Sequence, residues 1–458
     1  MKGPAVNNSA TSSLAVFASR LAYTDIPADV VEKAKLCLLD TLGCCVYGST
    51  LPPVRKLTNM ALAERSHPAA GILGTSHRTS AALAALVNGT AAHAFQLDEV
   101  HAGATLHPGS VVVPAVLALS DAAGGISGKD FIAAMVAGYE VGIRVGLATE
   151  GRMFKRGYHN QGTTGTLAAA AAAARVLGLD PAATGHALGI AASQSAGLMA
   201  VQEGANAKAF HSGRAAQSGV YAALLAKEGY TGIEDVLDVE YGGFFGTLVD
   251  AYNPEKLTLG LGGQWETLKV GYKLSPASNG SITAMATLAR IMEGNGLKAP
   301  DIDRIMASVS TNTLDHCGWE FDPSALKGVL AAQMNLRYGL AVMALDGVAT
   351  PAQYTEARIK SPDIAAFLPK IDVRVQDEFD QDGSLRLACA LEVRSRAGKA
   401  YVERTLYRPG SAEDPVSPEE LLQKFATLTM GIVSAEQGVE CRSHIERLEA
   451  QAHVRILG

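Results

Sequence analysis

The residues best suited to chemistry in this chain lie in the segment 97–108. It carries a carboxylate at Asp98, followed by a second acid, and imidazoles at His101 and His107. Its glycine and small residues make it a poor regular helix, and a loop backbone is free to turn several titratable side chains towards one point. Apolar helices are predicted on both sides, and burying an unpaired charge between them is expensive. The pattern therefore favours a functional cluster over a solvated loop.

Three further polar clusters follow, and each lies beside a predicted apolar helix. They supply imidazoles, cations and a hydroxyl: His159, then Lys208, His211 and Arg214, then Lys273 and Ser275. The second of these clusters precedes a helix predicted over 215–228, whose amino end favours an anion because its N–H groups are unpaired. Cations and histidines in an acidic protein indicate a pocket for a small di- or tricarboxylate. Neutralised carboxylates acidify the neighbouring C–H, and a neutral histidine or a desolvated lysine could move the proton.

A metal site is the alternative for the first cluster. Asp98, His101 and His107 are ligand types that bind iron or zinc in mixed sites. Their spacing fits no tight metal motif, and the sequence has no phosphate-binding loop, dinucleotide fingerprint, HExxH or GxSxG pattern. We therefore expect no metal and no cofactor.

Composition excludes several classes of partner. The chain has 458 residues, a net charge of −6 and no basic tract, which gives no electrostatic support for nucleic-acid binding. The longest apolar run, 167–174, falls short of the about 20 residues that span a membrane, and no signal peptide is evident. Six cysteines without paired spacing indicate a reduced, cytoplasmic protein. The 48% hydrophobic content predicts a self-complementary surface patch and hence a homodimer.

Periodicity and breaker residues predict the elements that position these clusters. Helices are predicted over 12–21, 27–46, 81–95, 108–122, 166–177, 215–228, 281–293, 326–345, 364–367, 415–428 and 433–454. Strands are predicted over 305–310, 371–376, 385–395 and 400–407, and none before residue 245. We expect a mainly α fold, with an all-helical domain over 1–268, a smaller α+β lid domain over 269–410, and C-terminal helices over 411–458 that rejoin the helical domain.

The four clusters, in this order, resemble the MmgE/PrpD family, which includes 2-methylcitrate dehydratases, cis-aconitate decarboxylases and iminodisuccinate epimerases. The similar motifs are Leu97-Asp98-Glu99-Val100-His101 followed by His107-Pro108, His159 before Gly162-Thr163-Thr164-Gly165-Thr166-Leu167, Lys208-x-x-His211-x-Gly213, and Lys273-x-x-Pro276. The resemblance implies a cofactor-independent homodimer whose active site lies between a helical domain and an α+β lid. Decarboxylase members differ by Asp-Asp-Thr at 98–100 and by a histidine at the position of Ser278.

These observations rank the functions. A lyase acting on a small polycarboxylate, as a dehydratase or a decarboxylase, comes first, and an epimerase of an imino- or amino-dicarboxylate comes second because it uses the same carbanion. A non-catalytic binding protein comes last. The catalytic candidates are His107, His159, Lys208 and Lys273, and the substrate-binding candidates are Asp98, His101, His211, Arg214 and Ser275. We expect the positive end of a helix to keep His159 neutral as a base, and nearby carboxylates to suit His107 as an acid.

Overall fold

The computed structural model describes residues 9–381, 383–454 and 456. The chain divides into two compact units, which are treated separately below. Unit 1 comprises the chain up to Met199 together with Ala207–Gly271 and the segment from Ser417 onwards. Unit 2 comprises Ala200–Asn206 and Tyr272–Val416.

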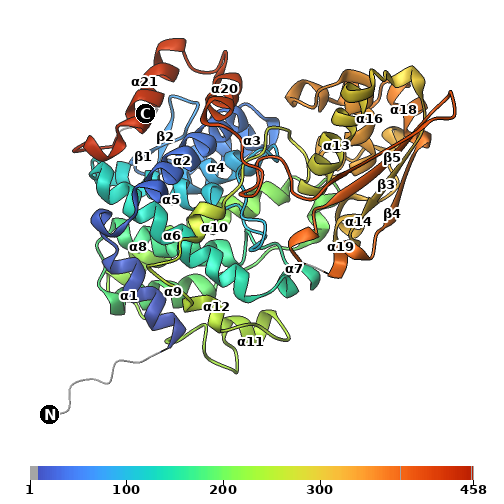
Figure 1. Cartoon of the computed structure of the whole chain (residues 1–458). Coiled ribbons are helices and arrows are strands. Elements are labelled where there is room, and N and C mark those ends of the chain that lie inside the picture. Colours follow the sequence, from blue (N-terminus) through green and yellow to red (C-terminus); the bar gives the residue numbers. More distant parts are fainter. Residues whose placement is uncertain (1–8, 382, 455, 457–458) are drawn as a thin grey trace. The chain divides into compact units, whose positions relative to one another are not determined.

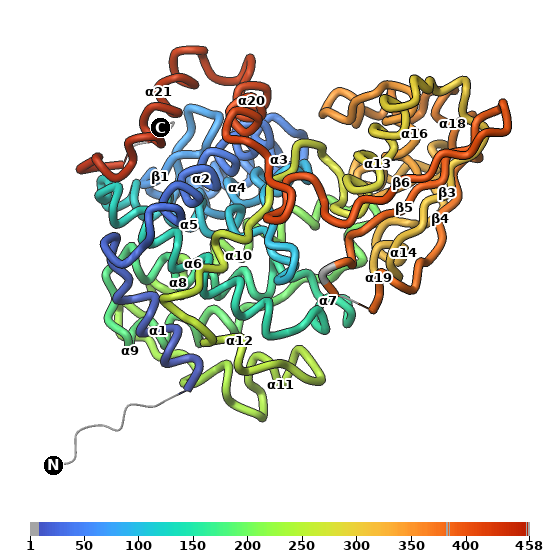
Figure 2. The backbone as a smooth tube through the Cα atoms, viewed as in Figure 1, coloured from blue at the N-terminus to red at the C-terminus, as the bar shows by residue number. Residues whose placement is uncertain are grey.

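Unit 1 is helical (Figure 1). Its helices are α1 (Ala10–Arg20), α2 (Ala28–Ser49), α3 (Pro52–Ala63), α4 (Ala81–His93), α5 (Gly109–Ala122), α6 (Gly128–Ala148), α7 (Arg152–Lys155), α8 (Thr164–Val176), α9 (Pro181–Ala192), α10 (Ala207–Lys227), α11 (Phe244–Leu248), α12 (Glu255–Thr258), α20 (Pro418–Thr429) and α21 (Ala435–Glu446). Helices α4, α5, α6, α8 and α10 pack against one another in its interior. Helices from the two ends of the sequence pack together: α20 and α21, red in Figures 1 and 2, lie against α2.

Small residues bring α4 and α10 into close contact. Gly89 and Gly213 meet where these helices cross, and a Cβ atom added to Gly213 would lie 2.0 Å from the carbonyl oxygen of Leu86. Only glycine fits at such a backbone approach. The crossing places the amino-terminal turns of α10 beside the carboxyl end of α4, where the candidate site lies.

Helix α6 is long and apolar enough, by length and composition, to cross a membrane. Of its most apolar window, 94% is buried inside the fold. It also carries a buried ion pair, in which Arg144 Nε lies 3.3 Å from Glu140 Oε2. These features are those of a core helix.

Unit 2 is an α+β module. Its longer elements are α13 (Asn279–Asn295), β3 (Ile302–Val309), α14 (Thr311–Cys317), α15 (Val329–Gln333), α16 (Leu336–Asp346), α17 (Glu356–Ile359), α18 (Pro362–Phe367), β4 (Ile371–Val375), α19 (Glu378–Gln381), β5 (Cys389–Ser395) and β6 (Ala400–Thr405). The strands form a mixed sheet of order β4-β3-β5-β6, in which β3 is parallel to β4 and antiparallel to β5. Helices α13 and α16 pack on the sheet and on each other. The predicted fold class, mainly helical with a smaller α+β region, is confirmed.

Several predicted element boundaries are wrong. The helix expected over 326–345 is two helices, because Asn335 accepts a hydrogen bond from the Tyr338 amide and starts α16 afresh. The strand expected from residue 385 begins at Cys389. Unit 1 also contains a two-residue antiparallel pair, β1 (Ala70–Gly71) and β2 (Arg78–Thr79), in a region where no strand was predicted.

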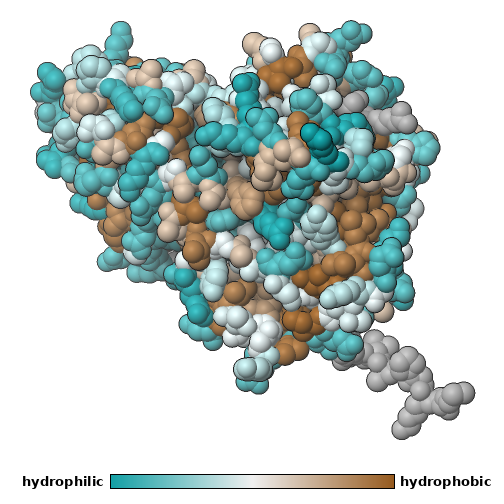
Figure 3. Space-filling view, turned by 180° about the vertical axis from the view of Figure 1, so that it is seen from behind, coloured by the Kyte–Doolittle hydropathy of each residue, from teal (hydrophilic) through white to brown (hydrophobic). Residues whose placement is uncertain are grey.

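Large apolar side chains are exposed on the outer face of α10. Phe210, Tyr221 and Leu225 are 39%, 43% and 40% exposed, and their spacing places them on one side of the helix. Figure 3 shows apolar side chains gathered into patches on one face of the molecule. Exposed apolar side chains of this kind can take part in protein–protein contacts, and the expected homodimer stays a prediction.

Candidate active site

The segment between α4 and α5 is irregular, as predicted. Gln96 and Thr105 adopt left-handed backbone conformations, with φ of 58° and 51°, and they lie on either side of Asp98. Such conformations cost energy in residues other than glycine and are concentrated at functional sites. They turn the chain so that Asp98 and His107 point back towards the end of α4.

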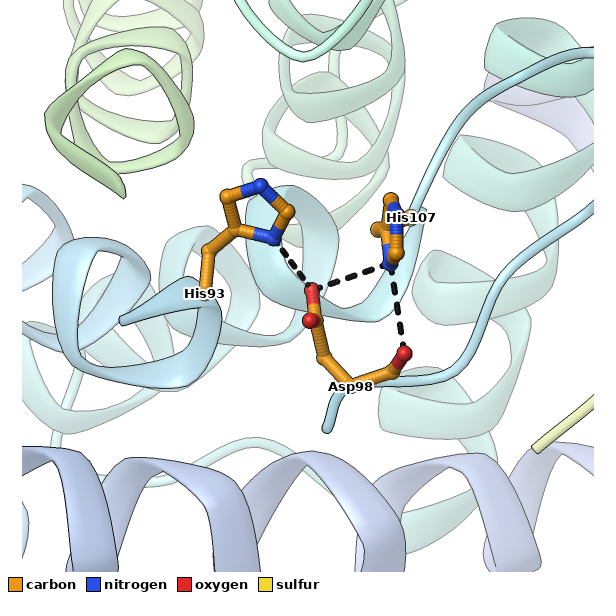
Figure 4. A group of neighbouring side chains, drawn as sticks. All are labelled: His93, Asp98 and His107. Carbon is orange, nitrogen blue, oxygen red and sulfur yellow. Dashed lines mark hydrogen bonds and ion pairs between the residues drawn. The ribbon is translucent and has the colours of Figure 1, made fainter. Parts of the chain in front are cut away.

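Two imidazoles share the carboxylate of Asp98 (Figure 4). His93 Nδ1 lies 2.7 Å from Asp98 Oδ2, and His107 Nδ1 lies 3.3 Å from the same oxygen. His107 Nδ1 is also 3.2 Å from the Asp98 carbonyl oxygen, which can only accept a hydrogen bond. His107 therefore carries a proton on Nδ1, and its Nε2 lies on the opposite side of the ring.

Lys208 fixes the tautomer of the other ring. Its ammonium lies 3.2 Å from His93 Nε2 and donates to Gln96 Oε1 at 2.9 Å. An ammonium only donates, so His93 Nε2 accepts and its Nδ1 proton is donated to Asp98. Burial lowers the pKa of His93 to about 3, and Lys208 adds to this effect while Asp98 opposes it. His93 is thus a neutral link between a cation and a carboxylate.

Asp98 is the acceptor of this cluster, and its side chain is fully buried. Burial alone would raise the pKa of Asp98, but His107 and His93 outweigh it and hold the pKa well below its usual value. Its second oxygen, Oδ1, has no hydrogen-bond partner among the residues that the structure describes. A buried carboxylate oxygen without a partner marks a place where a ligand could complete the site.

A second pair of imidazoles lies beside the first. His159 Nδ1 is 3.0 Å from His211 Nδ1, so one ring donates and the other accepts. The centroid of His159 is 5.6 Å from that of His93. Burial lowers the pKa of His159 well below its usual value, and Lys208 and the neighbouring imidazoles lower it further. Burial and Lys208 also lower the pKa of His211.

Gln161 connects the two halves of the cluster. Its Oε1 accepts from the His107 amide at 2.8 Å, and its Nε2 donates to Ser110 Oγ at 2.9 Å and to Ser212 Oγ at 3.2 Å. Ser212 lies on α10 and Ser110 on α5. The amide therefore holds the segment around His107 against the helix that carries Lys208.

The structure brings together some of the predicted residues and separates others. Asp98, His107, His159, Lys208 and His211 form the cluster described above. The remaining candidates are His101, Arg214, Lys273 and Ser275.

His101 turns to another partner. Its Nδ1 accepts from the Ala104 amide at 3.1 Å, and its Nε2 lies 3.3 Å from Glu266 Oε2. Glu266 has a pKa of about 2, because the hydrogen bonds from His101 and Lys269 outweigh its burial. These two hydrogen bonds fix the loop, and the predicted participation of His101 in substrate binding stays a prediction.

Arg214 is exposed on α10 and donates to Gln217 Oε1 at 2.6 Å. Lys273 is buried and Ser275 half-buried, and both belong to unit 2. Their predicted participation in catalysis and substrate binding stays a prediction.

Two sequence-based expectations about helix ends need correction. Lys208, His211 and Arg214 lie inside α10, which begins at Ala207 rather than at residue 215. His159 precedes the first residue of α8, Thr164, but its lowered pKa comes from burial, from Lys208 and from the neighbouring imidazoles rather than mainly from the helix end. The expected direction of the His159 pKa is confirmed.

The side-chain types of His93, Asp98 and His107 could also hold a metal ion. A metal requires lone pairs that converge on one point, whereas both Nδ1 atoms carry protons directed at the same carboxylate oxygen. In the arrangement described here the three residues form a hydrogen-bonded cluster, and the expected independence from metals stays a prediction.

His93, Gln96 and Gln161 are the members that sequence reasoning missed. His93 is the last residue of an almost wholly buried, alanine-rich helix, and the apolar pattern of that helix does not single it out. Its position five residues before Asp98, at the edge of a polar segment, was the available signal. The sequence gives no comparable signal for the two glutamines, because only the turns of the backbone bring their side chains to the cluster.

The fold is mainly helical, and its candidate site combines imidazoles, a lysine and a carboxylate. These groups are typical of an acid–base site in an enzyme. Comparison with known families identifies that class further. Residues 12–256 match the MmgE/PrpD N-terminal domain, and residues 276–449 match the MmgE/PrpD C-terminal domain. The chain therefore belongs to the MmgE/PrpD family.

The similar curated proteins carry one activity in their names. A cis-aconitate decarboxylase of Aspergillus terreus is 32% identical over 94% of this chain and 91% of its own length. A cis-aconitate decarboxylase-like protein of Aspergillus oryzae is 31% identical over 97% of this chain and 95% of its own. The cis-aconitate decarboxylase of Homo sapiens is 28% identical over 96% of this chain and 92% of its own.

Proposed function

We propose that this protein is a lyase that removes carbon dioxide from a small unsaturated tricarboxylate of the cis-aconitate type. The observation that carries the proposal is the cluster at Asp98, in which His93 and His107 contact the carboxylate, Lys208 contacts His93, and the pair of His159 and His211 lies beside them. The names of the similar proteins support the choice of substrate.

The reaction needs charge stabilisation and one proton. The bond between the substrate methylene and its carboxylate breaks, carbon dioxide leaves, and the electron pair spreads through the neighbouring double bond towards another carboxylate. A proton then joins the former olefinic carbon, which gives a dicarboxylate with a terminal methylene. The protein must therefore neutralise carboxylates and deliver a proton to carbon.

Lys208 supplies the charge in this proposal. Its side chain is 4% exposed, and in such an environment an ammonium attracts a carboxylate more strongly than it does in water. Burial is the main cause of the lowered pKa values of His159 and His211, and the charge of Lys208 lowers both further. A bound polycarboxylate would offset that field and favour proton uptake by the imidazoles.

His107 delivers the proton. Its Nδ1–H is directed at Asp98, which orients the ring and stabilises the imidazolium form, so that Nε2 can serve as the acid. His159, held neutral, takes the proton of the carboxyl group that leaves, because only the ionised carboxylate loses carbon dioxide.

A substrate panel tests the proposal. The pure protein is incubated separately with cis-aconitate, 2-methylcitrate and an imino-dicarboxylate, and carbon dioxide and product masses are measured. We expect one equivalent of carbon dioxide per turnover from cis-aconitate and no comparable reaction of the others. Loss of water from 2-methylcitrate without carbon dioxide would overturn the proposal in favour of a dehydratase, and racemised imino-dicarboxylate in favour of an epimerase.

A further inference from the structure

Two charged side chains that are far apart in the sequence meet beside the segment that carries Asp98. Asp40 lies on α2 and Lys424 on α20, and Lys424 Nζ is 2.6 Å from Asp40 Oδ1. Their side chains are 0% and 6% exposed, so this is a buried ion pair. Burying two charges costs desolvation that their attraction barely offsets, and an apolar pair of similar volume is often as stabilising. The pair therefore indicates a role in positioning.

The pair holds both peptide groups that flank Asp98. Lys424 Nζ donates to the carbonyl oxygen of Leu97 at 2.6 Å. The amide of Glu99 donates to Asp40 Oδ2 at 3.0 Å. Each member of the pair thus binds one side of Asp98 while the two bind each other, which leaves the intervening backbone little freedom to rotate.

The side chain of Glu99 extends this support to the start of α5. Its Oε1 accepts from the Gly109 amide at 2.7 Å and from Tyr139 Oη at 2.6 Å, and its Oε2 accepts from Thr41 Oγ1 at 3.1 Å. A Cβ atom on Gly109 would lie 2.2 Å from Thr41 Oγ1 and 2.4 Å from Glu99 Oε1, so the fit requires glycine. The segment is fixed before and after the catalytic candidates.

Small displacements of Asp98 matter because one oxygen serves two rings. Asp98 Oδ2 lies 2.7 Å from His93 Nδ1 and 3.3 Å from His107 Nδ1. A shift of about 1 Å would break one or both contacts, and misplacement on that scale costs on the order of 100-fold in rate.

We propose that Lys424 and Asp40 are positioning residues for the reaction. They fix the backbone on both sides of Asp98 and thereby determine the orientation and the tautomers of the His93 and His107 rings. The inference rests on the proposed function, and it adds residues from α2 and α20 that none of the four sequence clusters contains.

Each charge of the pair depends on the other. Burial raises the pKa of Asp40, and Lys424 opposes that rise. Burial would lower the pKa of Lys424, but Asp40 outweighs it and raises the value. A single substitution therefore leaves a buried charge without its counter-charge and can unfold part of the population, so a second variant is needed.

Three variants separate positioning from stability. Lys424→Met removes the ammonium that binds Asp40 and the carbonyl oxygen of Leu97. The double variant Asp40→Asn/Lys424→Gln removes both charges and keeps an amide donor for Leu97 and an acceptor for Glu99. Lys35→Met is the matched control, because Lys35 also lies on α2, is likewise 6% exposed and pairs with Glu449 at 2.7 Å in the C-terminal segment.

Two readouts are needed, and both are taken per folded protein, with the folded fraction from circular dichroism. The first is kcat and KM for cis-aconitate. We expect Lys424→Met to lower kcat about 10- to 100-fold with little change in KM, because Lys424 positions a catalytic group and does not touch substrate. The double variant should recover most of the loss, and Lys35→Met should leave kcat unchanged.

The second readout is the tautomeric state of His93 and His107 by ¹⁵N NMR, which requires no substrate. We expect the Nδ1-protonated forms in the wild type, the double variant and Lys35→Met, and a mixture in Lys424→Met. Unchanged tautomers and unchanged kcat in folded Lys424→Met would overturn the inference. Altered tautomers in a protein that acts on none of the acids would instead refute the proposed function and leave the positioning role standing.

Discussion

Replacing Lys208 by methionine removes the ammonium of the cluster and keeps a side chain of similar length. Lys208 is 4% exposed and lies 3.2 Å from His93 Nε2, so its charge acts where water screens it weakly. Truncating one partner of a buried, hydrogen-bonded charge pair costs about 2–5 kcal/mol. At about 1.4 kcal/mol per factor of ten, kcat/KM for cis-aconitate should fall about 30- to 4,000-fold.

Steady-state kinetics with Lys227→Met as the control test this prediction. Lys227 is exposed in the last turn of the same helix, so its loss should change kcat/KM less than about twofold. We expect a raised KM to account for most of the loss in Lys208→Met, since the lysine binds a carboxylate. The pKa of His159 should also rise in the variant, because Lys208 lowers it. A normal KM with a collapsed kcat would refute the binding role and make Lys208 a proton carrier, and an unchanged kcat/KM would remove it from the site.

Three further predictions follow from the cluster and the surface. The pKa of His93 is about 3 in the folded protein, so only the unfolded chain takes up this proton as pH falls from 6.5. The difference in free energy of unfolding between the wild type and His93→Gln, measured by urea titration, should therefore shrink by about 1.4 kcal/mol per pH unit. A constant difference would contradict the assignment. His159→Gln should remove the acidic limb of the pH–rate profile and His107→Gln the basic limb, each with a loss of rate of about 10²–10⁴-fold. His77 is exposed, and His77→Gln should change neither limb. Loss of the same limb in both variants would refute the division of roles. Light scattering should give the mass of a dimer for the wild type and of a monomer for Tyr221→Glu, and a monomeric wild type would contradict the expected homodimer.

The fold could be predicted because its signals are local. Runs of small apolar residues separated by glycine mark the helices of unit 1, and alternating residues around 385–407 mark two of the strands of unit 2. The predicted start of α10 at residue 215 is wrong, because the helix begins at Ala207. In the fold Gly213 is required by the crossing with α4, which no local pattern reveals.

The site could be predicted only in part, because side-chain direction depends on distant contacts. His101 and His107 are equivalent by sequence, yet a left-handed turn at Thr105 and a glutamate far along the chain, Glu266, direct one away from the cluster and the other into it. No local pattern distinguishes His93 from a core residue, because its helix is apolar throughout. Its function appears only when α10 brings Lys208 to its ring.

The most direct test of the account is the reaction of cis-aconitate in deuterated water, followed by proton and carbon NMR. We expect one equivalent of carbon dioxide and a dicarboxylate with a terminal methylene, carrying one solvent deuterium on the carbon that was olefinic, with no deuterium in recovered substrate. This result would show that the cluster stabilises the charge left by carbon dioxide and returns a proton to carbon. Unchanged cis-aconitate under conditions in which the protein is folded, or a hydrated product that retains all three carboxylates, would contradict the central claim.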